Sequence, residues 1–324
     1  METNALPKSQ LLNILCLVLI AGLTLNSISP ITSIPLSRQL ADYAVELMFI
    51  FLLGGALMFL LKQNFIMAVS FIGCIALNIF LKDAQNQTFS YTTATQDLEL
   101  TVAYLALEEV DEDKLEKLAN LNTNFLSIEV PTSAEYRAKL IQYLAQSHPY
   151  QQAIQQDEGK EVLIFSSYRL EDLDTIYCNG VPSLAGAIYI DSLHEQIRFL
   201  GTYIPQTPLD AQDSYETAEE HLTHLSSYLK TTATTQPLIT VSEIHLKSWA
   251  PELKAFKDSN TLHDSRMDLE FSNLEKHIFY SEELVCTSFE SISFGEGVVG
   301  TYQFRKSTSS TKESTPSQLT QVMM

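Results

Sequence analysis

Three apolar runs near the N-terminus constrain the fold of this chain more than any other feature of its sequence. They cover residues 10–26, 43–61 and 65–81, and only the tripeptide KQN separates the second run from the third. A helix of about 20 apolar residues crosses a lipid bilayer, and these runs are close to that length. We therefore predict a membrane anchor over residues 1–82 with three transmembrane helices, the last two joined as a tight hairpin.

The first apolar run has a second interpretation as a cleaved signal peptide. The stretch LTLNSISP is a poor cleavage site, however, and further apolar runs follow it, so a retained helix fits the sequence better. Lys8 and Lys62 place the N-terminus and the hairpin turn in the cytoplasm by the positive-inside rule. On that topology everything after Lys82 is periplasmic, and the chain is an integral protein of a bacterial inner membrane.

The rest of the chain is strongly acidic. Of the 20 basic and 39 acidic residues, only four and three lie in residues 1–82, which leaves a net charge of −20 for the remainder. A protein that binds nucleic acid gains affinity from clustered Lys and Arg, and no such cluster occurs here. The composition argues against nucleic acid and leaves the membrane and another protein of the cell envelope as the expected partners.

The four cysteines, Cys16, Cys74, Cys178 and Cys286, form no C-x-x-C pair and no Cys/His cluster. This spacing gives no support to a zinc site or a redox motif built on cysteine. Cys16 and Cys74 lie in the apolar runs and are expected to be buried. Cys178 and Cys286 are able to pair in an oxidising compartment, but the sequence does not give their distance, so both states stay open.

Short strands and amphipathic helices alternate over residues 98–305, after a polar linker at 83–97. The predicted helices cover 110–122, 131–146 and about 211–230, and the predicted strands cover 98–107, 124–130, 162–168, 185–190, 197–204, 238–241, 277–281, 284–294 and 298–304. Several strands follow one another directly, which favours two packed mixed sheets flanked by helices over a doubly wound parallel sheet. The low-complexity tail at 306–324 is predicted to be disordered.

Seven short segments, taken in order, resemble landmarks of the endonuclease/exonuclease/phosphatase superfamily. They are LTVAYLAL, TNFLSIEV, VLIFSSYRLEDL, VPSLAGAIYI, FLGTYIPQTP, PLITVSEIHLKSWAPEL and HIFYS. With the helices that precede them, they are most similar to the bacterial membrane-anchored branch, which has three N-terminal helices. The resemblance covers about residues 98–305 and implies an α/β (α+β) fold, a four-layer sandwich with the active site at one end of its two sheets.

The resemblance also implies a chemistry. Active members of the superfamily use magnesium or another divalent ion to polarise a phosphodiester or phosphomonoester. A His–Asp pair activates water, and Asn and Asp side chains hold the phosphate and the metal. The glutamate that ligates the metal falls on Glu129 of this chain.

Most of the other catalytic positions carry different residues. The first-strand Asn falls on Ala106, the His of Gly-Thr-His on Tyr203, and the Asp of Asp-His-Ile on Lys276. The Gly-Asp-Phe-Asn element becomes SEIH at 242–245, and FGEGVVGTY, which aligns with the closing Ser-Asp-His, contains neither Asp nor His. Because each such group contributes a large factor to the rate, their combined loss predicts a pseudoenzyme with a binding or structural role and no cofactor.

A few residues keep a second interpretation open, that of a divergent metal-dependent phosphoesterase. Glu129 is either a metal ligand or a solvated acid at a strand end. Glu243 and His245 point to the same face of a strand, and such a donor pair suits a transition metal better than magnesium. That site needs a third ligand, for which His277 and the stretch HDSR at 263–266 are the candidates. The alternative is that Glu243 and His245 are polar residues tolerated where catalysis was lost.

Overall fold

The computed structural model of this protein describes residues 8–30, 34–84, 99–156, 159–178, 180–191, 194–204, 212–232, 236–266 and 275–305. In chain order, the elements are α1 (Lys8–Ile28), α2 (Pro35–Asp42), α3 (Ala44–Leu60), α4 (Asn64–Ala84), β1 (Leu100–Ala106), α5 (Glu112–Asn120), β2 (Phe125–Pro131), α6 (Ala134–Leu144), β3 (Tyr150–Gln155), β4 (Lys160–Ser166), β5 (Arg169–Cys178), β6 (Val181–Ile190), β7 (Glu195–Ile204), α7 (Gln212–Thr231), β8 (Leu238–Ile244), α8 (Pro251–Ser259), β9 (Leu262–Asp264), β10 (Lys276–Ser281), β11 (Leu284–Ile292) and β12 (Glu296–Phe304). The predicted tail at 306–324 lies outside the described residues, as does the linker at 83–97 apart from its first two residues.

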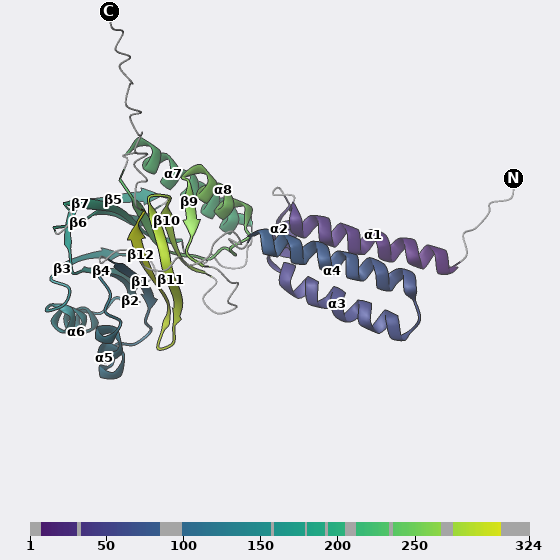
Figure 1. Ribbon diagram of the computed structural model, residues 1–324, viewed down its shortest axis with the longest axis horizontal. Coiled ribbons are helices and arrows are strands. Elements are labelled where there is room, and N and C mark those ends of the chain that lie inside the picture. The colour runs from purple at the N-terminus through teal and green to yellow at the C-terminus, as the bar shows by residue number, and fades with distance from the viewer. Residues whose placement is uncertain are drawn as a thin grey trace, which may run out of the picture.

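The helices α1, α3 and α4 form a bundle that projects from one side of the domain (Figure 1). Two stretches, Gln10–Ile28 in α1 and Asn64–Lys82 in α4, are long and apolar enough to cross a membrane. α3 has only 17 residues and falls short of that length, because Tyr43 separates it from α2 and a turn at Lys62 follows it. The prediction of three spans is therefore corrected to two helices of spanning length and one shorter apolar helix.

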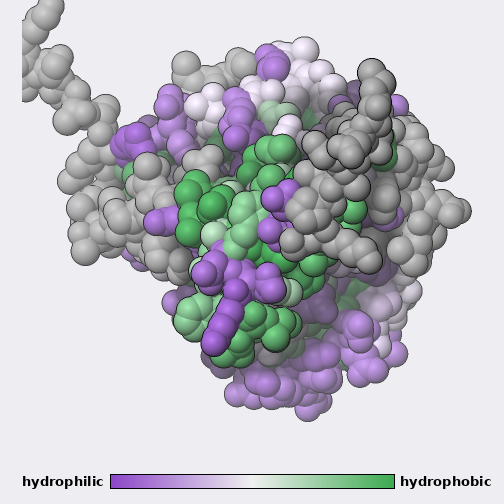
Figure 2. All heavy atoms as spheres, turned by 90° about the vertical axis from the view of Figure 1, so that its right-hand side faces the viewer, coloured by the Kyte–Doolittle hydropathy of each residue, from purple (hydrophilic) through white to green (hydrophobic). Residues whose placement is uncertain are grey.

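The surface of this bundle is apolar where it faces away from the protein. Only 11% of the α1 stretch and 28% of the α4 stretch are buried, unlike the core helices of a soluble domain. Figure 2, which looks along the bundle from its far end, shows apolar residues on the bundle and hydrophilic residues on the domain behind it. Exposed apolar surface of this extent is typical of membrane-facing helices.

The domain contains two six-stranded sheets. The first sheet has the order β11-β12-β1-β2-β4-β3, and the second has the order β5-β6-β7-β8-β10-β9. β1 and β2 run parallel, as do β7 and β8, whereas the other described neighbours are antiparallel. α5 and α6 lie beside the first sheet, and α7 and α8 beside the second (Figure 1). The prediction of two mixed sheets flanked by helices is confirmed.

The space between the sheets is filled by large side chains from both of them. Phe125 of the first sheet meets Phe199 of the second with ring centroids 4.9 Å apart. The predicted apolar face of the long helix is also confirmed, because Ala218, Leu222, Leu225 and Leu229 are all buried in α7 against the second sheet. Burial of this kind is the main contribution to the stability of the domain.

Cys178 and Cys286 are both buried free thiols, and no disulfide joins them. Cys178 ends β5 in the second sheet, whereas Cys286 lies on β11 in the first. The pairing that the sequence left open is therefore not formed in this structure.

The domain contacts the helical bundle through a short segment that follows β8. The Nε1 of Trp249 donates a hydrogen bond to the backbone oxygen of Ala41 at 3.0 Å, and the indole packs against Leu81 of α4. Buried Arg38 of α2 forms an ion pair with Glu252 of α8 at 3.6 Å. Trp249 therefore joins the domain to the helical bundle.

Candidate functional site

A pocket of about 520 Å³ opens at the carboxyl ends of β1, β2 and β8. Ala106, Glu129 and Glu243 lie at these three strand ends, with Lys160 of β4 and Glu296 of β12 beside them. β1 and β2 are parallel and place Ala106 next to Glu129 in register. The pocket is therefore at the end of the sheets where the sequence placed the active site.

A buried tyrosine connects the two sheets beneath the pocket. The hydroxyl of Tyr104 lies 2.8 Å from an oxygen of Glu243 and 3.2 Å from an oxygen of Glu129. Burial and the two carboxylates raise the pKa of Tyr104 well above its usual value, so the phenol stays protonated and donates. The pKa of Glu129 is also raised, first by burial and then by the charge of Glu243.

Two lysines neutralise the carboxylates at the pocket floor. The Nζ of Lys160 lies 2.5 Å from Glu129, and the Nζ of Lys276 lies 3.3 Å from Glu243 and 2.9 Å from Glu296. Burial lowers the pKa of Lys276, but the charges of Glu243 and Glu296 outweigh it and hold that pKa above the ordinary value. Lys276 is therefore a charged ammonium group inside the site.

The residues of the pocket floor do not fit a magnesium ion. Magnesium requires a near-octahedral set of oxygen ligands. Here Glu129 and Glu243 already contact ammonium groups, and the strand end beside Glu129 offers only the methyl group of Ala106. Lys276 puts a positive charge where the superfamily has an aspartate. We therefore assign no catalytic step to a metal at this position.

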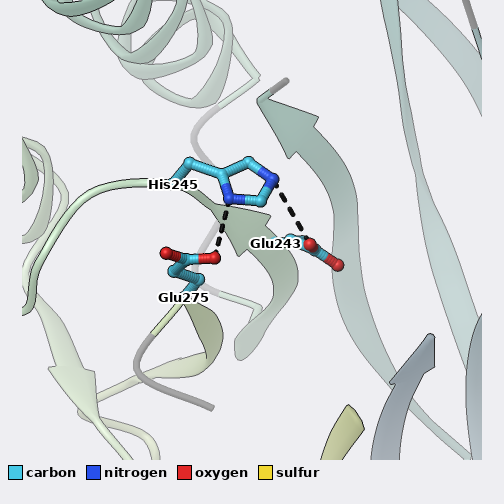
Figure 3. Close-up of side chains that lie close together, drawn as sticks. All are labelled: Glu243, His245 and Glu275. Carbon is cyan, nitrogen blue, oxygen red and sulfur yellow. Dashed lines mark hydrogen bonds and ion pairs between the residues drawn. The ribbon is translucent and has the colours of Figure 1, made fainter. Parts of the chain in front are cut away.

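His245 lies at the rim of the site between two carboxylates (Figure 3). Its Nδ1 is 2.7 Å from Glu275, and its Nε2 is 3.3 Å from Glu243. The ring of Tyr203 meets the imidazole edge-on, with centroids 6.0 Å apart. The hydrogen bond from His245 lowers the pKa of Glu275 despite partial burial of that carboxylate. One ligand atom from each of the three side chains lies within 4.8 Å of the others.

His277 does not take part in this cluster. On adjacent strands, His277 pairs in register with Ser242, whereas Lys276 pairs with Glu243. Successive residues of a strand point to opposite faces, so His277 lies on the helix-covered face of the sheet. It is fully buried and stacks on Phe279 with centroids 5.2 Å apart. The sequence proposal of His277 as a third ligand is corrected by this alternation.

The HDSR stretch is not the third ligand either. His263 lies against the ring of Tyr280, with centroids 5.6 Å apart, and Asp264 forms an ion pair with Lys257 at 3.8 Å. The third member of the cluster is Glu275, which immediately precedes β10.

Sequence reasoning missed three residues of this site. Tyr104 lies two residues before Ala106 on β1, so strand alternation alone would have placed it on the same face. Lys160 and Glu275 give no comparable local signal. Lys160 reaches the site through the pairing of β4 with β2, and Glu275 through the pairing of β8 with β10, which it immediately precedes.

Comparison with solved structures identifies the fold. The chain is similar to an endonuclease/exonuclease/phosphatase family protein from Bacteroides thetaiotaomicron, with a TM-score of 0.54 and 12% identity over 65% of this chain and 100% of that one. It is also similar to the human Nocturnin catalytic domain, with a TM-score of 0.51 and 12% identity over 64% of this chain and 95% of that one. A mannosyl-6-phosphatase from Bacteroides thetaiotaomicron gives a TM-score of 0.51 and 11% identity, over 64% and 99% of the two chains.

These likenesses establish that the domain has the endonuclease/exonuclease/phosphatase fold. One of these neighbours is a mannosyl-6-phosphatase, and another is named for a family of endonucleases, exonucleases and phosphatases. No family model matches the sequence, and no curated protein matches it. At these identities the comparison shows the fold alone, and the function has to be argued from the site.

Proposed function

We propose that this protein is a membrane-anchored module that uses the endonuclease/exonuclease/phosphatase fold to bind a ligand or partner without hydrolysing a phosphoester. The observation that carries the proposal is the contact of Lys160 with Glu129 and of Lys276 with Glu243. A divalent ion polarises phosphoryl oxygens and lowers the pKa of bound water, and an ammonium group does not replace it in the second task. The floor of the pocket therefore has charge balance without a group that activates water.

The lining of the pocket supports the same proposal. Among its described lining residues there is no histidine and no asparagine, which are the general base and the phosphate ligand of active members. The segment aligned with the closing Ser-Asp-His supplies Phe294, Gly295 and Glu296 instead, and Ser293, which precedes it, also lines the pocket. A glutamate at the rim adds negative charge where a phosphoester brings its own, so the lining disfavours that substrate.

The anchor defines where the module works. We propose that α1 and α4 anchor the module in the membrane and that the shorter apolar helix α3 packs against α4. The lysines at positions 8 and 62 favour a cytoplasmic N-terminus and a periplasmic domain. Trp249 and Arg38 hold that domain against the anchor, which suits a fixed binding or structural surface for another envelope protein. The acidic domain is a poor partner for nucleic acid.

The test is a hydrolysis assay on the full-length chain in detergent. Activity on p-nitrophenyl phosphate and bis-p-nitrophenyl phosphate is measured with magnesium or manganese. We expect rates no higher than the background measured without protein, in the unaltered chain and in the Glu129→Ala variant alike. Glu282→Ala, an exposed change outside the pocket, is the matched control. Hydrolysis that is lost in Glu129→Ala and kept in Glu282→Ala would overturn the proposal.

A second function, that of a divergent metal-dependent phosphoesterase, is favoured by the Glu243–His245–Glu275 cluster. This enzyme would not use the superfamily's metal position. Its hydrolysis would depend on His245 and Glu275 and would persist in Glu129→Gln. The same assay with these three variants separates it from both the binding module and an ordinary member of the fold.

A further inference from the structure

We infer that Glu243, His245 and Glu275 form a binding site for a transition-metal ion, with zinc as the first candidate. Figure 3 shows the three side chains together. Glu243 also lines the pocket, whereas His245 and Glu275 are not among its described lining residues, so the site lies at the rim of the pocket. The inference goes beyond the proposed function, because it holds whether or not the protein hydrolyses phosphoesters.

The geometry of the cluster is set by the backbone on both sides. Glu243 is the penultimate residue of β8, and His245 directly follows that strand. Glu275 directly precedes β10, the strand that pairs with β8. The backbone N–H of Ile244 donates to the backbone oxygen of Glu275 at 2.8 Å. This bond fixes the residues on either side of Ile244 next to Glu275, so the three ligand atoms approach within 4.8 Å without a metal to gather them.

The donor set matches a borderline transition metal. One imidazole nitrogen and two carboxylate oxygens are three common zinc ligands, and three protein ligands leave a fourth position open in tetrahedral zinc sites. Two carboxylates also balance the charge of a divalent ion. Magnesium prefers oxygen ligands alone, so the imidazole selects against it.

Contacts around the cluster hold the ligands in place. Tyr104 donates to the second oxygen of Glu243 at 2.8 Å and leaves Oε1 facing the histidine. Tyr203 meets the His245 ring edge-on and limits its rotation. Partners of this kind orient metal ligands and raise affinity in known sites.

The rim differs from the floor because a cation bound at Glu243 does not leave the displaced lysine without a partner. Lys160 lies 2.5 Å from Glu129, whereas His245 and Lys276 both lie 3.3 Å from the same oxygen of Glu243. Lys276 also has a closer partner in Glu296, whose side chain is 74% exposed. A metal at the rim takes the place of the contacts between His245 and the carboxylates, and Lys276 keeps its contact with Glu296.

The site is also open to ions from solution. The side chains of His245 and Glu275 are 16% and 32% exposed, and that of Glu243 is 5% exposed. An ion can therefore enter past the partly exposed side chains of His245 and Glu275. The buried carboxylate of Glu243 keeps the bound ion from being fully surrounded by water.

Zinc binding by the metal-stripped, full-length chain in detergent tests the inference. Competition with a fluorescent zinc indicator should give one ion per chain at micromolar affinity or tighter. His245→Ala and Glu275→Gln should each weaken binding by more than about 100-fold, since even changes to the groups that orient ligands cost about 10- to 100-fold. His263→Ala is the matched control and should bind as the unaltered chain does.

Cobalt gives a second readout that does not depend on the indicator. Bound cobalt should show visible absorption bands that disappear in Glu275→Gln, and circular dichroism checks that each variant keeps its fold. No zinc binding at sub-millimolar concentration, or equal binding by His245→Ala, would overturn the site.

The outcomes separate this site from the proposed function. Hydrolysis is measured on the same zinc-loaded samples. Zinc binding without hydrolysis supports both proposals. Zinc binding with hydrolysis supports the site and overturns the binding-module function, whereas absence of zinc binding overturns the site alone.

Discussion

The two faces of the second sheet differ in their polar residues where β8 pairs with β10: one face carries charged residues in ion pairs, and the other carries an uncharged histidine. On the face toward the pocket, Glu243 pairs with Lys276, and charged partners surround both. One residue away, Ser242 pairs with His277 on the helix-covered face. Burial lowers the pKa of His277 well below its usual value, and the nearby charge of Arg266 lowers it further. That imidazole is neutral and packed against Phe279.

Strand alternation therefore decides which polar residues can form a site. Lys276 and His277 are adjacent in sequence, yet only the lysine lies on the pocket face, where it contacts Glu243. On the pocket face, charge is balanced by opposite charge. On the helix face, the titratable group is kept uncharged by desolvation. Three substitutions test this difference, and they follow from the largest expected effect to the smallest.

Removal of the pocket-face lysine should have the largest effect. Lys276→Met leaves the buried carboxylate of Glu243 without its ammonium partner, since both side chains are about 5% exposed or less. Loss of one partner of a buried ion pair costs about 3–5 kcal/mol in unfolding free energy. Chemical denaturation of the full-length chain in detergent, followed by circular dichroism, measures the change. The double variant Lys276→Met, Glu243→Gln should recover most of the loss, and a loss below about 1 kcal/mol would show that the pair is solvated.

The helix face should respond to pH rather than to loss of a charge partner. His277 binds a proton in the unfolded chain below about pH 6.5 but not in the folded one, so stability is full above that pH and falls as the pH drops below it. The contribution of His277 to the unfolding free energy should fall by about 2 kcal/mol between about pH 7.5 and pH 5. His277→Phe should remove that share.

Part of the acid sensitivity should remain in His277→Phe. His221, whose pKa burial lowers to about 4, titrates in the same direction. Denaturation curves at the two pH values provide the test, with His263→Phe as the matched control. Equal pH dependence in His277→Phe and in the unaltered chain would mean that His277 is charged in the fold.

The smallest effect is expected for the second lysine of the pocket floor. The side chain of Lys160 is 41% exposed, although its partner Glu129 is only 3% exposed. Solvent screens this pair, so Lys160→Met should cost about 1 kcal/mol, clearly less than Lys276→Met. The same denaturation experiment compares the two. If Lys160→Met lowered the unfolding free energy more than Lys276→Met does, the Lys160–Glu129 pair would be the less solvated of the two, which contradicts the account.

The fold could be predicted from the sequence because its signals are local. The apolar stripe of α7 and the short apolar strands report burial through periodicity alone. β3 and β5 were missed because they are edge strands with many exposed polar residues, as in YQQAIQ and RLEDLDTIYC. β9, with three residues, is too short for any pattern.

The candidate site was predictable only in part. The position of Glu129 and the pairing of Glu243 with His245 follow from strand ends and alternation. The roles of Lys160 and Glu275 depend on how distant strands pair, and periodicity carries no information on that pairing. The count of membrane spans was wrong for a related reason, since an apolar run does not show where a helix begins and ends.

The central claim is that ammonium groups, rather than a divalent ion, balance the carboxylates at the pocket floor. Anomalous diffraction from crystals of the full-length chain soaked in manganese tests it most directly. We predict no manganese peak within about 2.6 Å of a Glu129 oxygen, with Lys160 and Lys276 in contact with Glu129 and Glu243. A manganese peak shared by Glu129 and Glu243, with the two lysines displaced, would contradict the account.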